Sequence, residues 1–197
     1  MSKSFGNNRG STDKDFNMPI SVRCCEKLIY VLDSGNNRIK VLTLSGNLVR
    51  HISHHGLNET SATAMALLKN DSDSVIQLLC LNWRLKLLSN YKIEFHENNN
   101  KESLSTYELK DSFEEPVGLM ETFHPEVFIV QDKKKLCLCG LNGVLMYDAL
   151  DAKLKNECGL KNVTAFVASL TTPSLFVADS SSNHGKQKNF NYDETLL

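Results

Sequence analysis

The feature that most constrains the fold of this chain is a short apolar run that recurs about every 48 residues. The run ends in Asp three times and in Cys once, and its four copies are Leu28–Asp33, Val75–Cys80, Val127–Asp132 and Leu175–Asp179. The last residues of successive copies lie 47, 52 and 47 positions apart. A repeat of this length is typical of a β-propeller, in which each repeat forms one four-stranded blade.

Two other landmarks of the sequence keep the same spacing. Pro19 opens a short apolar segment that is matched at Pro116, and the hairpin glycine Gly46 is matched at Gly143. Each of these pairs is separated by 97 positions, which is two repeats. Because independent landmarks share one period, we interpret the chain as a series of similar structural units.

Within the first repeat, every local signal predicts β-structure. Pro19 stands where a strand begins, a position that tolerates proline. A continuous apolar run follows, as expected for a strand that is buried on both faces. The turn residues 33–37, a strand over 39–44, a hairpin at 45–47 and a strand over 48–52 complete four strands. We therefore predict an all-β chain, a β-propeller of about four blades, each of four antiparallel strands.

These landmarks divide the chain into six segments. They are a lead-in that forms the outer strand of a preceding blade (1–16), blade 1 (17–60), a degenerate blade 2 (61–112), blade 3 (113–160), a partial blade 4 (161–182) and a polar tail (183–197).

The first repeat carries a family resemblance. Residues 16–52 combine a Pro opener, an apolar strand ending in Asp33, a Gly/Asn turn, Arg38 and the hairpin Gly46, and this combination resembles an NHL repeat. The later repeats match less well, since blade 3 lacks the Arg and blade 2 lacks both the Pro and the Asp. The resemblance implies a propeller similar to the C-terminal NHL domain of tripartite-motif (TRIM-NHL) proteins, which are ubiquitin ligases and translational regulators.

The number of blades leaves two interpretations open, because NHL propellers usually have about six. The one we favour is a partial or open arc, a fragment of a six-bladed ring, whose open edges pair with the remaining blades or with another chain. The alternative is a closed four-bladed ring, in which Lys186–Tyr192 supplies a third strand of blade 4 and Phe5–Gly6 completes it.

The recurring carboxylates predict a structural turn at Asp33, Asp132 and Asp179. An Asp side chain at the start of a turn accepts hydrogen bonds from backbone N–H groups two residues on. Blade symmetry places the three carboxylates in different blades, too far apart to share a metal ion. Arg38 and Arg84 follow this turn, and we interpret them as partners of a neighbouring carboxylate or carbonyl, with ligand contact as the alternative.

The turns between the second and third strands predict a binding surface, because blade symmetry opens all of them on one rim. Each turn carries cations, and one adds the only Trp of the chain. Basic groups beside an aromatic ring suit an acidic protein partner or single-stranded RNA. The predicted binding rim consists of Asn36, Asn37, Arg38, Asn82, Trp83, Arg84, Lys133, Lys134, Lys135, His184 and Lys186. Acidic residues of the blade-linking loops would neutralise part of this charge: Asp13, Asp15, Glu59, Asp111, Glu114, Glu115 and Glu157.

No motif in the sequence predicts catalysis or a cofactor. His51, His54 and His55 cluster near one strand end, but no further ligand lies close in sequence, so we interpret them as an exposed loop and predict no metal site. Cys137 and Cys139 alternate on one strand and read as packing residues. The chain has no nucleophile elbow, P-loop or glycine-rich dinucleotide turn. We expect neither an enzyme nor a bound cofactor.

The charge balance and the hydropathy pattern limit the partners. A net charge of −1 gives no global attraction to nucleic acid or to a membrane. We see no secretory signal and no membrane span, so we expect a cytoplasmic protein with six reduced cysteines. The leading hypothesis is a non-enzymatic module that recruits a protein partner for a ubiquitin ligase or a post-transcriptional regulator, and the alternative is RNA binding through the rim. Ligase activity itself would need a RING domain, whose Cys/His pattern this chain lacks.

Overall fold

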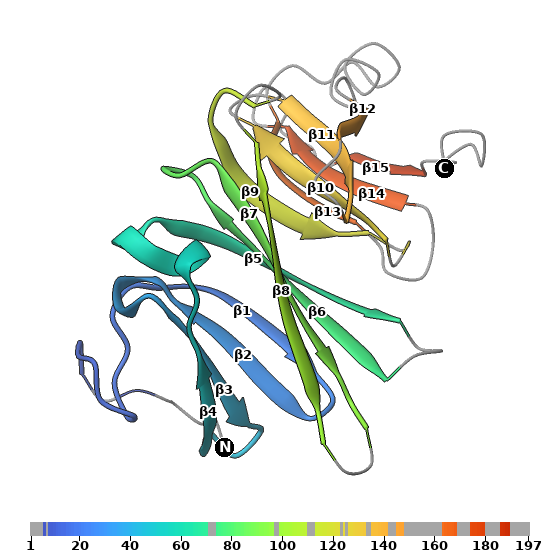
Figure 1. Ribbon diagram of the computed structural model, residues 1–197. Coiled ribbons are helices and arrows are strands. Elements are labelled where there is room, and N and C mark those ends of the chain that lie inside the picture. Colours follow the sequence, from blue (N-terminus) through green and yellow to red (C-terminus); the bar gives the residue numbers. More distant parts are fainter. Residues whose placement is uncertain are drawn as a thin grey trace.

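The computed structural model describes a chain built almost entirely of β-strands (Figure 1). The described residues are 6, 8–70, 74–96, 99–109, 113–122, 124, 126–132, 135–141, 145–147, 163–168, 174–179 and 186–189. They form four antiparallel sheets that follow one another along the chain, three with four strands and one with three. The prediction of an all-β chain built from repeated antiparallel blades is therefore confirmed.

Each sheet is a meander in which consecutive strands are neighbours. Blade 1 consists of β1 (Pro19–Cys25), β2 (Leu28–Asp33), β3 (Arg38–Thr43) and β4 (Leu48–Ile52). Blade 2 consists of β5 (Ala62–Asn70), β6 (Val75–Asn82), β7 (Leu87–Glu94) and β8 (Lys101–Glu108). Blade 3 consists of β9 (Pro116–Glu121), β10 (Val127–Asp132), β11 (Lys135–Gly140) and β12 (Leu145–Tyr147). Blade 4 consists of β13 (Val163–Ala168), β14 (Ser174–Asp179) and β15 (Lys186–Asn189).

The first strands of successive blades lie next to one another, β1 beside β5, β5 beside β9 and β9 beside β13 (Figure 1). They are the inner strands of the arc, and the later strands of each blade lie farther out. The strand β15 falls within the segment 183–197 that we predicted to be a polar tail. Two short 3-10 helices occur in the connections, η1 (Ser34–Asn36) and η2 (His55–Thr60), and no helix in the described part of the chain could span a membrane.

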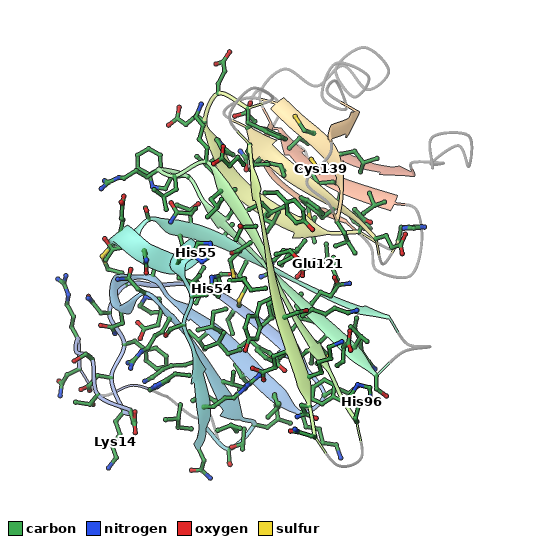
Figure 2. The ribbon with its side chains drawn as sticks, viewed as in Figure 1. Lys14, His54, His55, His96, Glu121 and Cys139 are labelled. Atoms are coloured by element: carbon green, nitrogen blue, oxygen red, sulfur yellow. The ribbon has the colours of Figure 1, made fainter. Side chains whose placement is uncertain are left out.

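The core consists of two apolar layers, one on each face of blade 2. This follows from the two-residue period of a strand, which sends alternate side chains of β6 to opposite faces. Towards blade 1, Leu78 and Cys80 pack against Tyr30 and Leu32. Towards blade 3, the intervening β6 residues pack on the β10 and β11 side chains Phe128, Val130, Cys137 and Cys139. The two thiols of β11 are packing residues in this layer, as predicted, and Cys139 is buried (Figure 2).

The register corrects one landmark of the repeat. Asp33 pairs with Pro19, and the residue that pairs with the start of β5 in the same way is Asn82, not Cys80. Cys80 lies two residues earlier, fully buried between blades 1 and 2. The apolar run of β6 is longer than that of the other blades and continues to Leu81, so it hid the polar residue that ends the strand. With Asn82 in place, the repeat spacings become 49, 50 and 47 residues.

Candidate functional site

The turns that follow the second strands have a left-handed residue at the same position in blades 1 and 2. In blade 1, Asn37 is left-handed, with φ of 53°, and its N–H donates to the carbonyl of Ser34 at 3.0 Å. In blade 2, Lys86 is left-handed, with φ of 46°, and its N–H donates to the carbonyl of Trp83 at 3.3 Å. The two turns thus correspond at this residue and at its hydrogen bond. They differ in their bond to the incoming segment, since Gly35 N–H donates to the carbonyl of Asn17 at 2.8 Å, whereas Trp83, one position earlier in its turn, donates to the carbonyl of Ser61 at 3.3 Å.

In blade 1 the turn is locked into the structure by the buried carboxylate of Asp33. Its Oδ1 accepts the backbone N–H of Asn17 at 2.6 Å. Its Oδ2 accepts the side chains of Asn36 and Arg38, both at 2.8 Å. The carboxylate therefore fastens the lead-in to the end of β2. The predicted cap, in which the carboxylate accepts an N–H group two residues on, is wrong for Asp33, because its side chain makes no capping hydrogen bond to η1 (Ser34–Asn36).

The other polar residues of this turn are also engaged within the protein. Arg38 is buried, pairs with Asp33 and donates to the carbonyl of Thr12 at 3.1 Å. Asn36 donates to the carbonyl of Gly10 at 2.9 Å, and Asn37 accepts the N–H of Thr60 at 2.8 Å. The structure thus places three residues of the predicted binding rim in contacts that hold the fold together.

In blade 2 an amide replaces the carboxylate. The Oδ1 of Asn82 accepts Ser61 Oγ at 2.9 Å and the Leu85 N–H at 3.1 Å. Its Nδ2 donates to the carbonyls of Gly56 and Asn58 at 3.2 and 3.0 Å. Here the incoming linker presents carbonyls, and no Arg stands opposite to neutralise a carboxylate. A neutral donor–acceptor group therefore satisfies the site without burying an unpaired charge.

Blade 3 repeats the arrangement of blade 1. The Asp132 carboxylate is buried and accepts the backbone N–H groups of Glu114 and Glu115 at 3.0 and 2.5 Å. In blade 4, Asp179 pairs with Val163 at the same position of the register. The end of the second strand is therefore the point at which blades 1 to 3 hold the segment that precedes their own first strand.

Two residues of the blade 2 turn point outward instead. Trp83 is 38 % exposed, whereas its counterpart Ser34 is 2 % exposed and donates to the carbonyl of Ala62 at 2.8 Å. The guanidinium carbon of Arg84 lies 5.6 Å from the centre of the indole ring, in a cation–π arrangement. Lys86 supports the turn, since its Nζ donates to the carbonyl of Phe113 at 3.0 Å. Among the rim side chains that the structure describes, Trp83 and Arg84 are the two that are exposed to solvent.

The remaining predicted rim residues are described only in part. Lys133, Lys134 and His184 lie outside the described residues. Lys135 and Lys186 begin β11 and β15, and their backbones are described without their side chains. The sequence comparison of Arg38 with Arg84 does not hold in the register, because Leu87 is the residue opposite Asn82.

A charged contact among the inner strands was not predicted from the sequence. Glu121 on β9 lies among the inner strands (Figure 2), and its Oε1 accepts the N–H of Leu67 on β5 at 2.7 Å. It also forms a salt bridge with Arg23 on β1. Three blades are thereby joined by one carboxylate. The signal in the sequence is that Arg23 and Glu121 are charged although they lie in inner-strand segments. The two residues are 98 positions apart, and only the arrangement of the blades brings them together.

The prediction of one exposed histidine loop is wrong, since His51 lies on β4 and His54 is partly buried just before η2, which begins at His55 (Figure 2). His54 stacks on Tyr91, with ring centres 5.9 Å apart and planes 10° from parallel. Burial and the neighbouring His55 lower the pKa of His54 to about 4. Neither of its ring nitrogens has a hydrogen-bond partner. Among the described residues, no three His, Cys, Asp or Glu side chains gather as a metal site.

Comparison with solved structures supports the propeller fold. The chain is similar to the WD40 domain of SCAP from fission yeast, with a TM-score of 0.53 and 11 % identity over 79 % of this chain and 38 % of that one. It is similar to a putative 6-phosphogluconolactonase from Bacteroides uniformis (TM-score 0.51, 10 % identity, 83 % and 50 % covered). A putative exported protein from Bacteroides fragilis gives a TM-score of 0.51 at 9 % identity, with 94 % and 54 % covered.

These similarities concern the fold alone, since the sequences are so different. The chain spans about half the length, or less, of these three proteins. No protein-family model and no curated protein matches the sequence. The NHL resemblance of residues 16–52 stays a prediction.

Proposed function

We propose that this chain is a non-enzymatic propeller module that binds a protein partner through Trp83 and Arg84. The observation that carries this proposal is that two turns with a left-handed residue at the same position carry different side chains. Blade 1 builds the turn with a buried Ser34 and Gly35, whereas blade 2 builds it with a Trp and an Arg that project into solvent. Since the turn forms without these large side chains in blade 1, the fold does not require them in blade 2.

Trp and Arg are the residue types that contribute most to protein–protein binding. A large aromatic side chain at a partly exposed position gains free energy when a partner covers it, and a guanidinium adds directed hydrogen bonds to a carboxylate. The partner that fits is a peptide segment with an apolar side chain against the indole and an acidic residue beside Arg84.

The resemblance of residues 16–52 to an NHL repeat supports a recruiting role of the TRIM-NHL type. In that role the propeller selects the target, and a separate domain or chain carries out ubiquitin transfer or translational control.

Single-stranded RNA is the second candidate, and the Trp83–Arg84 pair is the observation that favours it. A base stacks on an aromatic ring, and an adjacent guanidinium contributes a cation–π contact and a phosphate contact. Binding of this kind weakens steeply as salt is added, since it releases counterions.

A peptide selection tests the proposal directly. We would select peptides from a displayed random library on the wild-type protein, and measure the anisotropy of the labelled winners with wild type, Trp83→Ala and Arg84→Ala. The expected result is at least about tenfold weaker binding by Trp83→Ala, the size of a hot-spot loss. The matched control is Leu44→Ala, an exposed apolar residue at the opposite end of blade 1.

Equal binding by wild type and Trp83→Ala would overturn the proposal. A labelled single-stranded RNA pool, titrated at low and at physiological salt, separates the second candidate. Binding to the RNA that depends on both Trp83 and low salt would favour RNA over a peptide.

A further inference from the structure

The two ends of the arc carry exposed apolar faces that correspond to buried faces inside it. Each internal interface is formed by two kinds of sheet face, which we name by their position. The trailing face of a blade packs on the following blade, as Tyr30 of blade 1 and Leu79 of blade 2 do. The leading face packs on the preceding blade, as Met65 of blade 2 and Leu119 of blade 3 do.

Blade 1 has a leading face with no blade on it. The register pairs Val22 with Val31, just as Met65 pairs with Cys80 and Leu119 with Val130. Val22 is 56 % exposed, whereas Met65 is 0 % and Leu119 is 7 % exposed. Ile20, the neighbour of Val22 on the inner strand, is 43 % exposed. One structural position is thus buried in blades 2 and 3 and open in blade 1.

The lead-in covers only the outer part of this face. Lys40 on β3 donates through Nζ to the carbonyls of Asp13 and Asp15 at 2.8 and 2.6 Å, and it lies 4.2 Å from the centre of the Phe16 ring. The charge that this face would otherwise present is therefore satisfied by the protein itself. What stays open is the apolar inner part around Ile20 and Val22.

Blade 4 has the complementary trailing face open. Phe176 pairs with Val167, just as Tyr30 pairs with Arg23 in blade 1. Phe176 is 39 % exposed and Val167 is 56 % exposed, whereas Tyr30 and the equivalent Leu79 are buried. The two open faces are therefore the two halves of one internal interface.

We propose that a second copy of this chain occupies these faces, with blade 4 of each copy packed on blade 1 of the other. This occupant is favoured because the contact continues the interface that already joins blades 1, 2 and 3, and because each copy carries both of the faces that the contact needs. The association does not depend on the function proposed for Trp83, which lies at the turn rim.

Head-to-tail pairing makes a distinctive prediction for single variants and their mixture. A closed pair contains two identical junctions, each made of one leading face and one trailing face. Val22→Arg places a charge in both junctions, and so does Phe176→Arg. When the two variants are mixed, one junction carries both changes and the other carries none, so an open heterodimer with one intact junction forms.

Light scattering coupled to size-exclusion chromatography measures this on the 197-residue chain. The wild type is expected at twice its mass of 22.1 kDa, at about 100 µM, where an interface of micromolar affinity is occupied. Val22→Arg and Phe176→Arg are each expected at the monomer mass, and their equimolar mixture regains a dimer. Leu44→Arg, a change at an exposed hairpin residue, is the control and stays dimeric.

The folded state of each variant is checked by circular dichroism. The two monomeric variants are expected to melt alike and somewhat below the dimeric wild type, because association stabilises the folded state and both side chains are exposed in the single chain. A monomeric wild type overturns the proposal. So does a Phe176→Arg variant that stays dimeric while Val22→Arg does not, since that result means two blade 1 faces pack on each other. A mixture that stays monomeric also contradicts head-to-tail pairing.

Discussion

The turn after β2 and the turn after β6 have a left-handed residue at the same position. The polar side chains of the first turn make contacts within the protein, whereas two side chains of the second turn face solvent. In blade 1, Asp33 and Arg38 form a buried ion pair that fastens the lead-in. In blade 2, neutral Asn82 fastens the linker instead, and the next two side chains project outward. This difference indicates that the repeat specifies the left-handed residue and one polar anchor, the side chain at the end of the second strand that holds the incoming segment. The other side chains of the turn can contribute to stability or to binding.

The largest expected effect comes from breaking the anchor of blade 1. Asp33→Ala leaves Arg38 buried without its carboxylate, so we expect the free energy of unfolding to fall by about 3–5 kcal/mol. Urea denaturation followed by circular dichroism measures the loss.

A second prediction comes from placing the residues of the blade 2 anchor at the equivalent positions of blade 1. The double variant Asp33→Asn/Arg38→Leu recreates the combination of Asn82 and Leu87 and leaves no unpaired buried charge, so we expect it to recover part of the stability lost in Asp33→Ala. The rest stays lost, because the new Nδ2 faces the Nδ2 donor of Asn36. Lys40 continues to donate to the Thr12 and Asp15 carbonyls that Arg38 contacts. A double variant as unstable as the sum of its single changes would contradict the equivalence of the two turns.

A smaller effect is expected at the anchor of blade 2. Asn82→Ala removes the side-chain donor to the Gly56 carbonyl and the acceptor of the Leu85 N–H, whereas the Asn58 carbonyl keeps Ser61 Oγ as a donor, and it should lower the free energy of unfolding by about 2–3 kcal/mol. Cys80→Ser, a buried change at the position that the sequence first suggested as the anchor, is the comparison variant. If the anchor is Asn82, hydrogen exchange of the linker amides over residues 56–61 should rise in Asn82→Ala and not in Cys80→Ser.

A pH effect is expected beside the same linker. Burial lowers the pKa of His54 from 6.5 to about 4, so the folded protein favours its neutral form. Above pH 6.5 the ring is neutral in the folded and unfolded states, and His54 causes no loss of stability. As the pH falls from 6.5 towards 4, the unfolded state takes up the proton first, and the free energy of unfolding falls by an amount on the order of 1–3 kcal/mol.

The variant His54→Phe isolates this effect, because the ring keeps its stacking on Tyr91 and loses two nitrogens that have no partner. We expect stability at pH 7 to be equal or higher in His54→Phe, and its melting temperature to change less between pH 7 and pH 5 than that of the wild type. An identical acid response in the two proteins would show that other groups, such as His51, cause it.

The sequence predicted the elements of the fold that depend on local pattern. The Pro opener, the apolar run and the terminal Asp identified the blades, whereas the carboxylates of Asp33 and Asp132 accept N–H groups of the segment before the first strand of their own blade, which no local pattern predicts. The sequence placed the blade 2 landmark at Cys80 and not at Asn82, because the apolar run of β6 continues past Cys80 and does not show where the strand ends. A two-residue error leaves the side chain on the same face of the strand.

What the sequence did not predict depends on contacts between distant repeats. The Arg23–Glu121 pair joins strands that are two repeats apart, and no local pattern specifies which inner-strand charges meet at the axis. Arg38 and Arg84 look alike in the sequence but occupy different places in their turns, since Arg38 follows the left-handed Asn37 by one residue and Arg84 precedes the left-handed Lys86 by two. Arg38 opens β3, whereas Arg84 precedes the left-handed residue and faces solvent.

The most direct test of this account transplants the blade 1 turn into blade 2. The double variant Trp83→Ser/Arg84→Gly gives the β6–β7 turn the side chains found at Ser34 and Gly35. If the two outward side chains serve binding and not folding, its free energy of unfolding stays within about 0.5 kcal/mol of the wild type while binding of the selected peptides is lost. A free energy of unfolding that falls by several kcal/mol, or peptide binding as strong as that of the wild type, would contradict the account.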